Sequence, residues 1–395
     1  MIFLTIILLC ELAHAAAQTA AASQSFPIPS ILTPHVPTEP AFYDNGPVAQ
    51  PFAPLSQLWD WLRMSDWASE YEIYRDGGGS CSLYDRTFWV FCDTAAYSRT
   101  TGELIGFSSN SMTAVMNFSD PKDLKDFTMT PSTGWSPAIP FTIEETDYNI
   151  ASDQRYALWT FTNCVQLTET RAMHFFLVEK FSNTNFPTVT GNTMAIYTMD
   201  PDTNEITIER PERYWFGNTT YTFGSFANVV VDNVAYLYGL DTVYSGSYDV
   251  HLARVPVGSE TNKTSYSYYD AASGEFSSTM PVPTTRRQDN AVIRGTQPFD
   301  TGTVFWSDYH NAFLLVYLLL DSTFRVASAP SPVGPWNVSD TLLAESTAGV
   351  GPNYGGVAVP IYYQQPGQVA GKELLLAYTY QNTTHKYPKI LQVTF

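Results

Sequence analysis

From about Tyr71 onward, the chain alternates short apolar runs with turns rich in Gly, Asn, Asp, Ser and Pro. The runs are rich in Val, Ile, Tyr, Phe, Trp and Thr, as in TFWVFCD, MHFFLVEKF, NAFLLVYLLL and KELLLAYTY. No long window keeps the apolar period of about 3.6 residues that an amphipathic helix requires. Short β-branched and aromatic runs bounded by turn residues are typical of antiparallel strands. The sequence therefore predicts an all-β chain.

The number of these runs constrains the architecture further. Hairpin-like starts fall near residues 72, 150, 222, 300 and 352, each followed by two to four strands. This spacing divides the chain into five units of roughly 65 residues, longer than the 40–50 typical of named propeller repeats. Radial repetition leaves only short, protected sheet edges. We expect a five-bladed β-propeller in a single domain, residues 55–395; a two-sheet sandwich or a larger barrel is the alternative.

The N-terminal segment predicts export. Residues 2–13 are almost all apolar, and Ala13-His14-Ala15 has the form of a signal-peptidase site, so residues 1–17 are expected to be a signal peptide. The apolar run is too short for a membrane span, which needs about 20 residues. Residues 18–54, rich in Pro, Ala and Ser, are expected to form an extended leader, tethered or disordered. Residues 55–64 (LSQLWDWLRM) are expected to form a short helix.

Glycosylation sequons and charge indicate the environment and the partners. Five Asn-x-Ser/Thr sequons favour a secreted, extracellular glycoprotein; their asparagines are Asn117, Asn218, Asn262, Asn337 and Asn382. The formal net charge is −18. Nucleic-acid binding proteins present a basic surface, so we expect no nucleic-acid partner. We expect a monomer without a membrane span.

The cysteines allow one disulfide. After removal of the signal peptide, Cys81, Cys92 and Cys164 remain. If Arg86 and Thr87 form a two-residue loop, Cys81 lies directly opposite Cys92, and a close antiparallel pair can be bridged. Two alternatives stay open: both are buried free thiols, or Cys92 pairs with Cys164. No metal-ligand motif requires a cofactor, although a structural cation in a channel would balance clustered negative charge.

The stretch YRDGGGSCSLYDRTFWVFCDT, which starts at Tyr74, places one carboxylate beyond each end of this hairpin. Asp76 precedes the first strand and Asp93 follows the second, so both lie at the same end. Gly77, Gly78 and Gly79 lack a Cβ and allow close approach of backbone or ligand. Two carboxylates facing one cavity are the groups that cleave glycosides, one as acid and one as base or nucleophile. The alternative is that both are ordinary turn residues.

The same stretch resembles the start of a propeller family long catalogued as a domain of unknown function, which includes bacterial endo-D-arabinanases. Members open with an Arg-Asp-Gly-Gly-Gly-like turn and an aromatic strand ending in Phe-Gly-Asp-Thr; here Cys92 replaces the glycine. Weaker islands cover about residues 70–395, at NSMTAVM, HLARVPVGS with YSYYD, RVASAPSPVGPW and YGGVAVPIYY. The last island departs from the family, because Val359-Pro360 stands where members often have His-Pro.

The resemblance implies a five-bladed propeller and an endo-acting glycosidase with Asp76 and Asp93 as its two acids. It favours Asp76 as base or nucleophile and Asp93 as acid, with the reverse order open. The stereochemical outcome and the polysaccharide also stay open.

Five further residues are candidates for contacts with substrate: Asn110, Trp306, Asp308, Arg325 and Tyr354. Each has an ordinary alternative, namely a turn Asn bonded to backbone, a core Trp, a solvated Asp, a strand-end Arg and a tight turn. Glu144 and Glu145 are expected at the surface.

Three function classes follow. The first is a secreted glycoside hydrolase, endo-acting on an arabinan-like furanoside polysaccharide. The second is a carbohydrate-binding propeller without catalysis. The third is a cell-surface interaction protein in which the pocket has no role.

Overall fold

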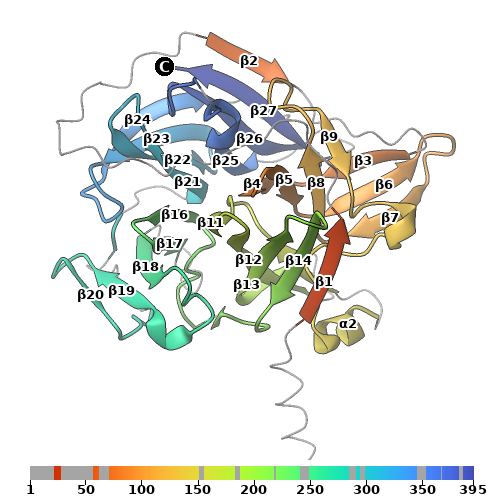
Figure 1. Ribbon diagram of the computed structural model, residues 1–395, viewed down its shortest axis with the longest axis horizontal. Coiled ribbons are helices and arrows are strands. Elements are labelled where there is room, and N and C mark those ends of the chain that lie inside the picture. Colours follow the sequence, from red (N-terminus) through yellow and green to blue (C-terminus); the bar gives the residue numbers. More distant parts are fainter. Residues whose placement is uncertain are drawn as a thin grey trace, which may run out of the picture.

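The computed structural model is an antiparallel all-β structure (Figure 1). It describes residues 22–27, 57–61, 71–150, 155–182, 187–217, 219–240, 249–283, 291–293, 299–344, 353–365, 367–381 and 386–395. Within these described residues, the structure contains beside the strands one α-helix and three short 3-10 helices: α2 (Ile143–Ile150), η1 (Pro131–Thr133), η2 (Lys263–Ser265) and η3 (Pro360–Tyr363). Among the described residues, no helix combines the length and the apolar character needed to cross a membrane.

Blade 1 is a long sheet interrupted at its middle. Its outer part contains β3 (Tyr71–Arg75), β6 (Thr94–Ser98) and β7 (Leu104–Ser108). Its inner part contains β4 (Gly78–Leu83), β5 (Arg86–Phe91), β8 (Ser111–Val115) and β9 (Leu124–Asp126). Backbone hydrogen bonds from Asp76 N–H to Asp93 O and from Cys92 N–H to Gly77 O join the two parts into one blade.

The other four blades are separate antiparallel sheets. Blade 2 contains β10 (Arg155–Trp159), β11 (Val165–Thr168), β12 (Arg171–Phe181), β13 (Thr188–Asp200), β14 (Glu205–Arg210) and β15 (Phe216–Gly217). Blade 3 contains β16 (Ala227–Val231), β17 (Val234–Leu240), β18 (Val250–Pro256), β19 (Ser267–Asp270) and β20 (Glu275–Ser277). Blade 4 contains β21 (Phe299–Ser307), β22 (Ala312–Leu319), β23 (Thr323–Ala329) and β24 (Asn337–Ala344). Blade 5 contains β25 (Tyr354–Val359), β26 (Glu373–Gln381) and β27 (Lys386–Thr394).

The inner strands β4, β11, β16, β21 and β25 form a closed ring, because each contacts the next and β25 contacts β4. Neighbouring inner strands run in parallel. Thr301 donates to the carbonyl of Gly356 at 2.7 Å and Thr303 donates to that of Ala358 at 3.1 Å, with a constant offset along both strands. The five-bladed propeller expected from the sequence is therefore confirmed. Its blades begin at residues 71, 155, 227, 299 and 354, close to the expected starts.

Two strands from the N-terminal segment add outer edges to blades 2 and 5. β1 (Ala22–Pro27) pairs with β14, and β2 (Gln57–Trp61) pairs with β27, as Figure 1 shows in red and orange. The expected helix over residues 55–64 is wrong where the structure describes it, because the unpaired edge of β27 gives residues 57–61 a ladder of backbone partners. The expected signal peptide and most of the expected leader lie outside the described residues.

The disulfide expected between Cys81 and Cys92 is also wrong. The turn between β4 and β5 lies at Tyr84-Asp85, so Cys81 faces Phe88 and not Cys92. Cys81 is bonded to Cys164 with a Cα–Cα distance of 5.0 Å, and Cys92 is a buried free thiol. The bridge therefore links the inner strand of blade 1 to the segment that enters the inner strand of blade 2.

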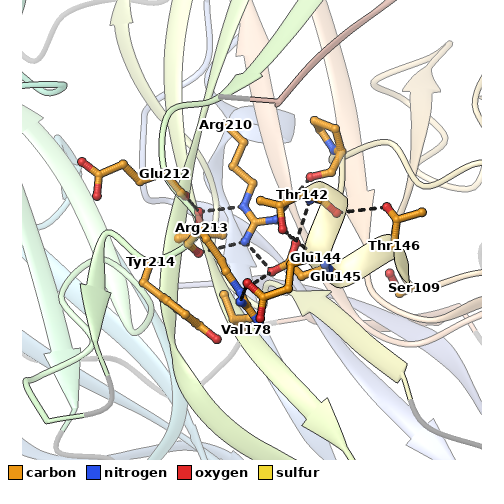
Figure 2. Close-up of polar contacts among 12 residues, drawn as sticks. Ser109, Thr142, Glu144, Glu145, Thr146, Val178, Arg210, Glu212, Arg213 and Tyr214 are labelled. Atoms are coloured by element: carbon orange, nitrogen blue, oxygen red, sulfur yellow. Dashed lines mark hydrogen bonds and ion pairs between the residues drawn. The ribbon is translucent and has the colours of Figure 1, made fainter. Parts of the chain in front are cut away.

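Helix α2 is fixed to blade 2 by a buried ion pair (Figure 2). Both guanidinium end nitrogens of Arg210 donate to the Glu145 carboxylate, at 2.5 and 2.9 Å, and both side chains are fully buried. Arg213 pairs with the half-exposed Glu144. The expected surface position therefore fails for Glu145, whose charge is buried because Arg210 balances it.

Candidate functional site

Asp76 and Asp93 lie opposite each other where the long sheet of blade 1 is interrupted. Arg75 pairs with Thr94 below them, and Asp76 N–H donates to Asp93 O at 2.8 Å. The same hairpin register that separates Cys81 from Cys92 therefore brings the two aspartates together. The sequence-based expectation that they share one end of the hairpin is confirmed.

The glycines after Asp76 are required by close backbone contacts. A Cβ on Gly78 would overlap the carbonyl oxygen of Val90, and one on Gly79 would overlap that of Thr162. Gly77 N–H donates to Thr379 Oγ1 at 2.6 Å. Gly77 and Gly79 therefore allow blade 1 to approach blade 5 and blade 2 beside the first aspartate, and Gly78 allows the close pairing of β4 with β5.

Both carboxyl groups line one pocket of about 200 Å³. Its other lining residues come from the outer sheet of blade 1 and from the start of β27: Tyr74, Arg75, Ala95, Tyr97, Phe107 and Lys386. The pocket lining therefore combines charged side chains with aromatic ones.

Asp93 is held by two residues of β10. Arg155 donates from both end nitrogens to the Asp93 carboxylate, at 2.6 and 3.1 Å, and Trp159 Nε1–H donates to it at 2.9 Å. Arg155 and Trp159 are four residues apart on one strand, so their side chains share a face. The Arg155 guanidinium also lies 4.1 Å from the ring centroid of Phe181. These donors orient Asp93 and balance a negative charge on it.

Asp76 has a different environment, although it lies directly opposite. Its side chain is 10% exposed, Tyr354 O–H donates to its Oδ1 at 2.9 Å, and the Lys386 ammonium lies 3.6 Å from Oδ2. Burial raises the pKa of Asp76 from 3.8 to about 6; Lys386 opposes the rise and Asp93 adds to it. A carboxyl group with a pKa of about 6 can gain and release a proton near neutral pH, which general acid or base catalysis uses.

Two further titratable groups lie near the pair. Burial and the charges of Asp76 and Asp93 raise the pKa of the Cys92 thiol well above its usual value, and the thiol donates to Thr160 O at 3.0 Å. Cys92 is therefore a neutral, unreactive packing residue. Glu179 pairs with Ala157 and shares the sheet face of Trp159. Glu179 is 6% exposed, and burial raises its pKa to about 7.

Of the five candidates for substrate contact, the structure brings Tyr354 to the pair, as the hydrogen-bond partner of Asp76. Asn110 is fully buried, and its Oδ1 accepts a hydrogen bond from Ile139 N–H at 2.7 Å. The alternative, an Asn that bonds to the backbone, is therefore the observed one. Arg325 lies on β23, paired with Tyr317, and does not line the pocket.

Trp306 Nε1–H donates to Asp308 Oδ1 at 2.9 Å, and neither residue lines the pocket of the aspartates. β21 enters the ring beside blade 5 at Thr301, and Trp306 lies five residues further along the strand. At about 3.3 Å per residue, Trp306 lies roughly 17 Å from Thr301 along β21. Trp306 packs against Phe313 at 5.0 Å, so it is a blade residue.

The sequence reasoning missed Arg155, Trp159 and Lys386. The i, i+4 pattern of Arg155 and Trp159 on a predicted strand was a signal that they share a face. Nothing in the local sequence of Lys386 indicates its contact with Asp76, because the two residues come from blades at opposite ends of the chain.

In the part of the chain that the structure describes, no group of three or more His, Cys, Asp or Glu side chains is arranged to hold a metal ion. Asn117, Asn262 and Asn337 are exposed, so three of the five sequons are accessible. Asn218 and Asn382 lie outside the described residues.

Comparison with solved structures identifies proteins of similar fold. A provisionally assigned hydrolase from Bacteroides ovatus superposes with a TM-score of 0.58 at 15% identity, over 88% of this chain and 97% of that chain. Two glycoside hydrolases superpose less closely. The GH62 α-L-arabinofuranosidase catalytic domain of Coprinopsis cinerea has a TM-score of 0.44 at 9% identity, over 87% and 98% of the chains. The GH43_1 enzyme of Xanthomonas citri, complexed with xylose, has 0.44 at 11%, over 80% and 87%. No family model and no curated protein sequence matches this chain.

Proposed function

We propose that this protein is a secreted glycoside hydrolase, endo-acting on an arabinan-like furanoside polysaccharide, and that Asp76 and Asp93 are its two acids. The observation that carries the proposal is the convergence of both carboxyl groups on one pocket, with the pKa of Asp76 raised to about 6. Two carboxyl groups in different environments meet the requirement of glycoside hydrolysis for one protonated and one ionised group.

The environments favour Asp76 as the proton donor, which reverses the order that the resemblance favoured. Asp76 is buried and gains a proton readily, whereas Asp93 accepts three hydrogen bonds from Arg155 and Trp159. These three N–H···O hydrogen bonds are stronger when the accepting carboxyl group is ionised. In this proposal Asp76 protonates the leaving glycosidic oxygen. Asp93 stays ionised and either attacks the anomeric carbon or takes a proton from the attacking water.

Export is supported by two features that suit an oxidising compartment. The Cys81–Cys164 bridge is a structural disulfide, and such bonds persist in secreted proteins. The exposed sequon asparagines fit the apolar N-terminal segment at residues 2–13. Release of a glycosylated, shortened chain into the medium by a eukaryotic host would support this part of the proposal; retention of residues 1–17 would contradict it.

The test is hydrolysis of a panel of arabinans, D-arabinan included, by the native chain and by Asp76→Asn and Asp93→Asn. Asp232→Asn is a matched control, because Asp232 is exposed in the β16–β17 turn, where its positive φ suits Asn. We expect oligosaccharide release by the native chain and the control, and loss of at least 100-fold in both site variants, the order of magnitude for a positioned proton donor.

The products also decide the stereochemistry. NMR of the first-formed anomer distinguishes a nucleophilic Asp93, which gives retention, from a basic Asp93, which gives inversion. Release of no oligosaccharide from any arabinan, with binding retained by all four proteins, would overturn the hydrolase and favour a carbohydrate-binding propeller.

A further inference from the structure

The outer sheet of blade 1 has one covered face and one open face. On the covered face, Ile73 and Ala96 pack with Met129, and Gly106 lies directly under the ring of Trp135. The next residues along each strand alternate to the other face. That face carries the side chains that line the pocket.

The strand register orders the open face into two rows. The first row, adjacent to the aspartates, runs Tyr74–Ala95–Phe107 across β3, β6 and β7. Further out, the second row runs Glu72–Tyr97–Leu104, because a register shift in β7 skips Ile105 and places Leu104 opposite Tyr97. We call Tyr74, Ala95, Phe107, Tyr97 and Leu104 the aromatic face.

The aromatic face is accessible, and its five residues are aromatic or aliphatic; the half-buried Glu72 adjoins them opposite Tyr97. Phe107 is 44% exposed and Leu104 is 55% exposed, although both are large apolar residues. The rings of Tyr74 and Tyr97 meet edge to face at 5.7 Å, which fixes their orientation. Single exposed apolar residues are common, but contiguous ones mark binding surfaces, and four of these five residues line the same pocket.

The shape and the position of the face both indicate its ligand. Small Ala95 leaves a depression between Tyr74 and Phe107, whose strands are two strand spacings, about 10 Å, apart. Asp93 and Tyr97 are four residues apart on one side of the same chain segment, which corresponds to roughly 13 Å. The face therefore begins at the carboxyl pair and extends over the length of two or more sugar units.

We propose that the aromatic face is a subsite that binds the sugar units next to the cleaved bond, with rings stacked on Tyr97 and Phe107. Sugar rings combine apolar C–H faces with hydroxyl edges, so they match an aromatic floor bordered by carboxylates and by Lys386. This inference rests on the proposed function, and it names the substrate as a run of several sugar units and not a single terminal sugar.

The test uses binding, so that it does not depend on catalysis. In Asp76→Asn, Kd is measured by calorimetry for arabino-oligosaccharides from the disaccharide to the hexasaccharide, alone and combined with Tyr97→Ala, Phe107→Ala or Ala95→Phe. Tyr84→Ala is the matched control, since Tyr84 is a half-exposed aromatic in the β4–β5 turn, outside the pocket. Tyr97→Ala is the cleaner removal, because the Phe107 ring also touches the Arg155 guanidinium at 5.1 Å.

We expect affinity to rise with chain length in Asp76→Asn and in the control. Tyr97→Ala and Phe107→Ala should abolish the rise and weaken hexasaccharide binding about tenfold, equivalent to ~1.4 kcal/mol. Ala95→Phe should weaken it as well by filling the depression. An unchanged length dependence in these folded variants, an equal loss in the control, or no binding by Asp76→Asn would overturn the proposal. If binding depends on chain length but the native chain hydrolyses nothing, the proposed hydrolase function is contradicted and the aromatic face remains as a carbohydrate-binding site.

Discussion

At the scale of single residues, burial of the Asp76 carboxyl couples stability to pH. Asp76 titrates near 3.8 when unfolded and near 6 in the folded protein. The folded state thus favours the protonated form, and the stability that this group contributes below about pH 4 is lost as pH rises through 6. At neutral pH the ionised Asp76 destabilises the fold.

Asp76→Asn should therefore be more stable than the native chain at about pH 7.5, by on the order of 2–3 kcal/mol, and equally stable at about pH 4. The gain corresponds to a few degrees in Tm for a domain of this size. Denaturant unfolding at both pH values measures it, with Asp232→Asn as the exposed control. A variant less stable than the native chain at neutral pH would contradict the account of burial.

Lys386 influences the pH at which Asp76 titrates. Its ammonium lowers the pKa of Asp76, so Lys386→Met should raise this pKa above 6, whereas Lys386→Arg should retain it. With Asp76 as proton donor, kcat/KM declines above its pKa, and in Lys386→Met the decline should begin at higher pH. The pH profiles of the three proteins test this. A shift to lower pH would exclude Lys386 as the neighbouring charge.

Sequence reasoning at this scale found the two aspartates and Tyr354, but not Arg155, Trp159 or Lys386. Asp76 and Asp93 belong to one hairpin, and local chain geometry suffices to bring them together. Tyr354 and Lys386 reach Asp76 only when blade 5 closes against blade 1, a contact between residues that no local pattern relates.

At the scale of elements, a displaced turn decides the chemistry of the cysteines. Tyr84 adopts a φ of 53°, which a bulky residue rarely does, so the sequence favoured a turn two residues later. The observed register removes Cys92 from Cys81. It also packs β4 beside the segment that contains Cys164.

Loss of this bridge should be costly. It spans 83 residues, and the chain-entropy account gives about 4.5 kcal/mol for such a loop. We expect Cys81→Ala, Cys164→Ala and the double variant to lose similar stability, on the order of 3–5 kcal/mol, because each removes the same bond. Cys92→Ala keeps the bond and should lose about 1 kcal/mol. Equal Tm values for Cys81→Ala and Cys92→Ala would contradict a structural role of the bridge.

At the scale of the whole molecule, an N-terminal strand secures the last blade. β2 supplies backbone partners for β27 over residues 57–61. Sequence patterns located the five blades because turn residues mark their starts. They failed at β2, because an isolated edge strand takes its conformation from a neighbour distant in the sequence.

The double variant Trp59→Pro/Asp60→Pro tests this closure. Successive N–H groups of a strand point to opposite sides, so one of the two prolines must remove a bond to β27. The matched control, Ser23→Pro/Gln24→Pro, disrupts β1, which lies on the outer edge of blade 2. We expect the β2 variant to have the lower Tm and, with the edge of β27 unpaired, to associate as concentration rises. If the β1 variant instead has the lower Tm of the two, β1 and not β2 contributes more to the stability of the closed ring.

The pairing of Asp76 with Tyr354 has a consequence for biosynthesis. The two residues are 278 positions apart, and the ribosome makes blade 1 long before blade 5. A nascent chain that has folded only its first four blades lacks the blade 5 residues around Asp76, so the burial that raises the pKa of this carboxyl is incomplete. The proton-exchanging site therefore arises only when the ring closes, so a chain that still lacks blade 5 does not yet contain it.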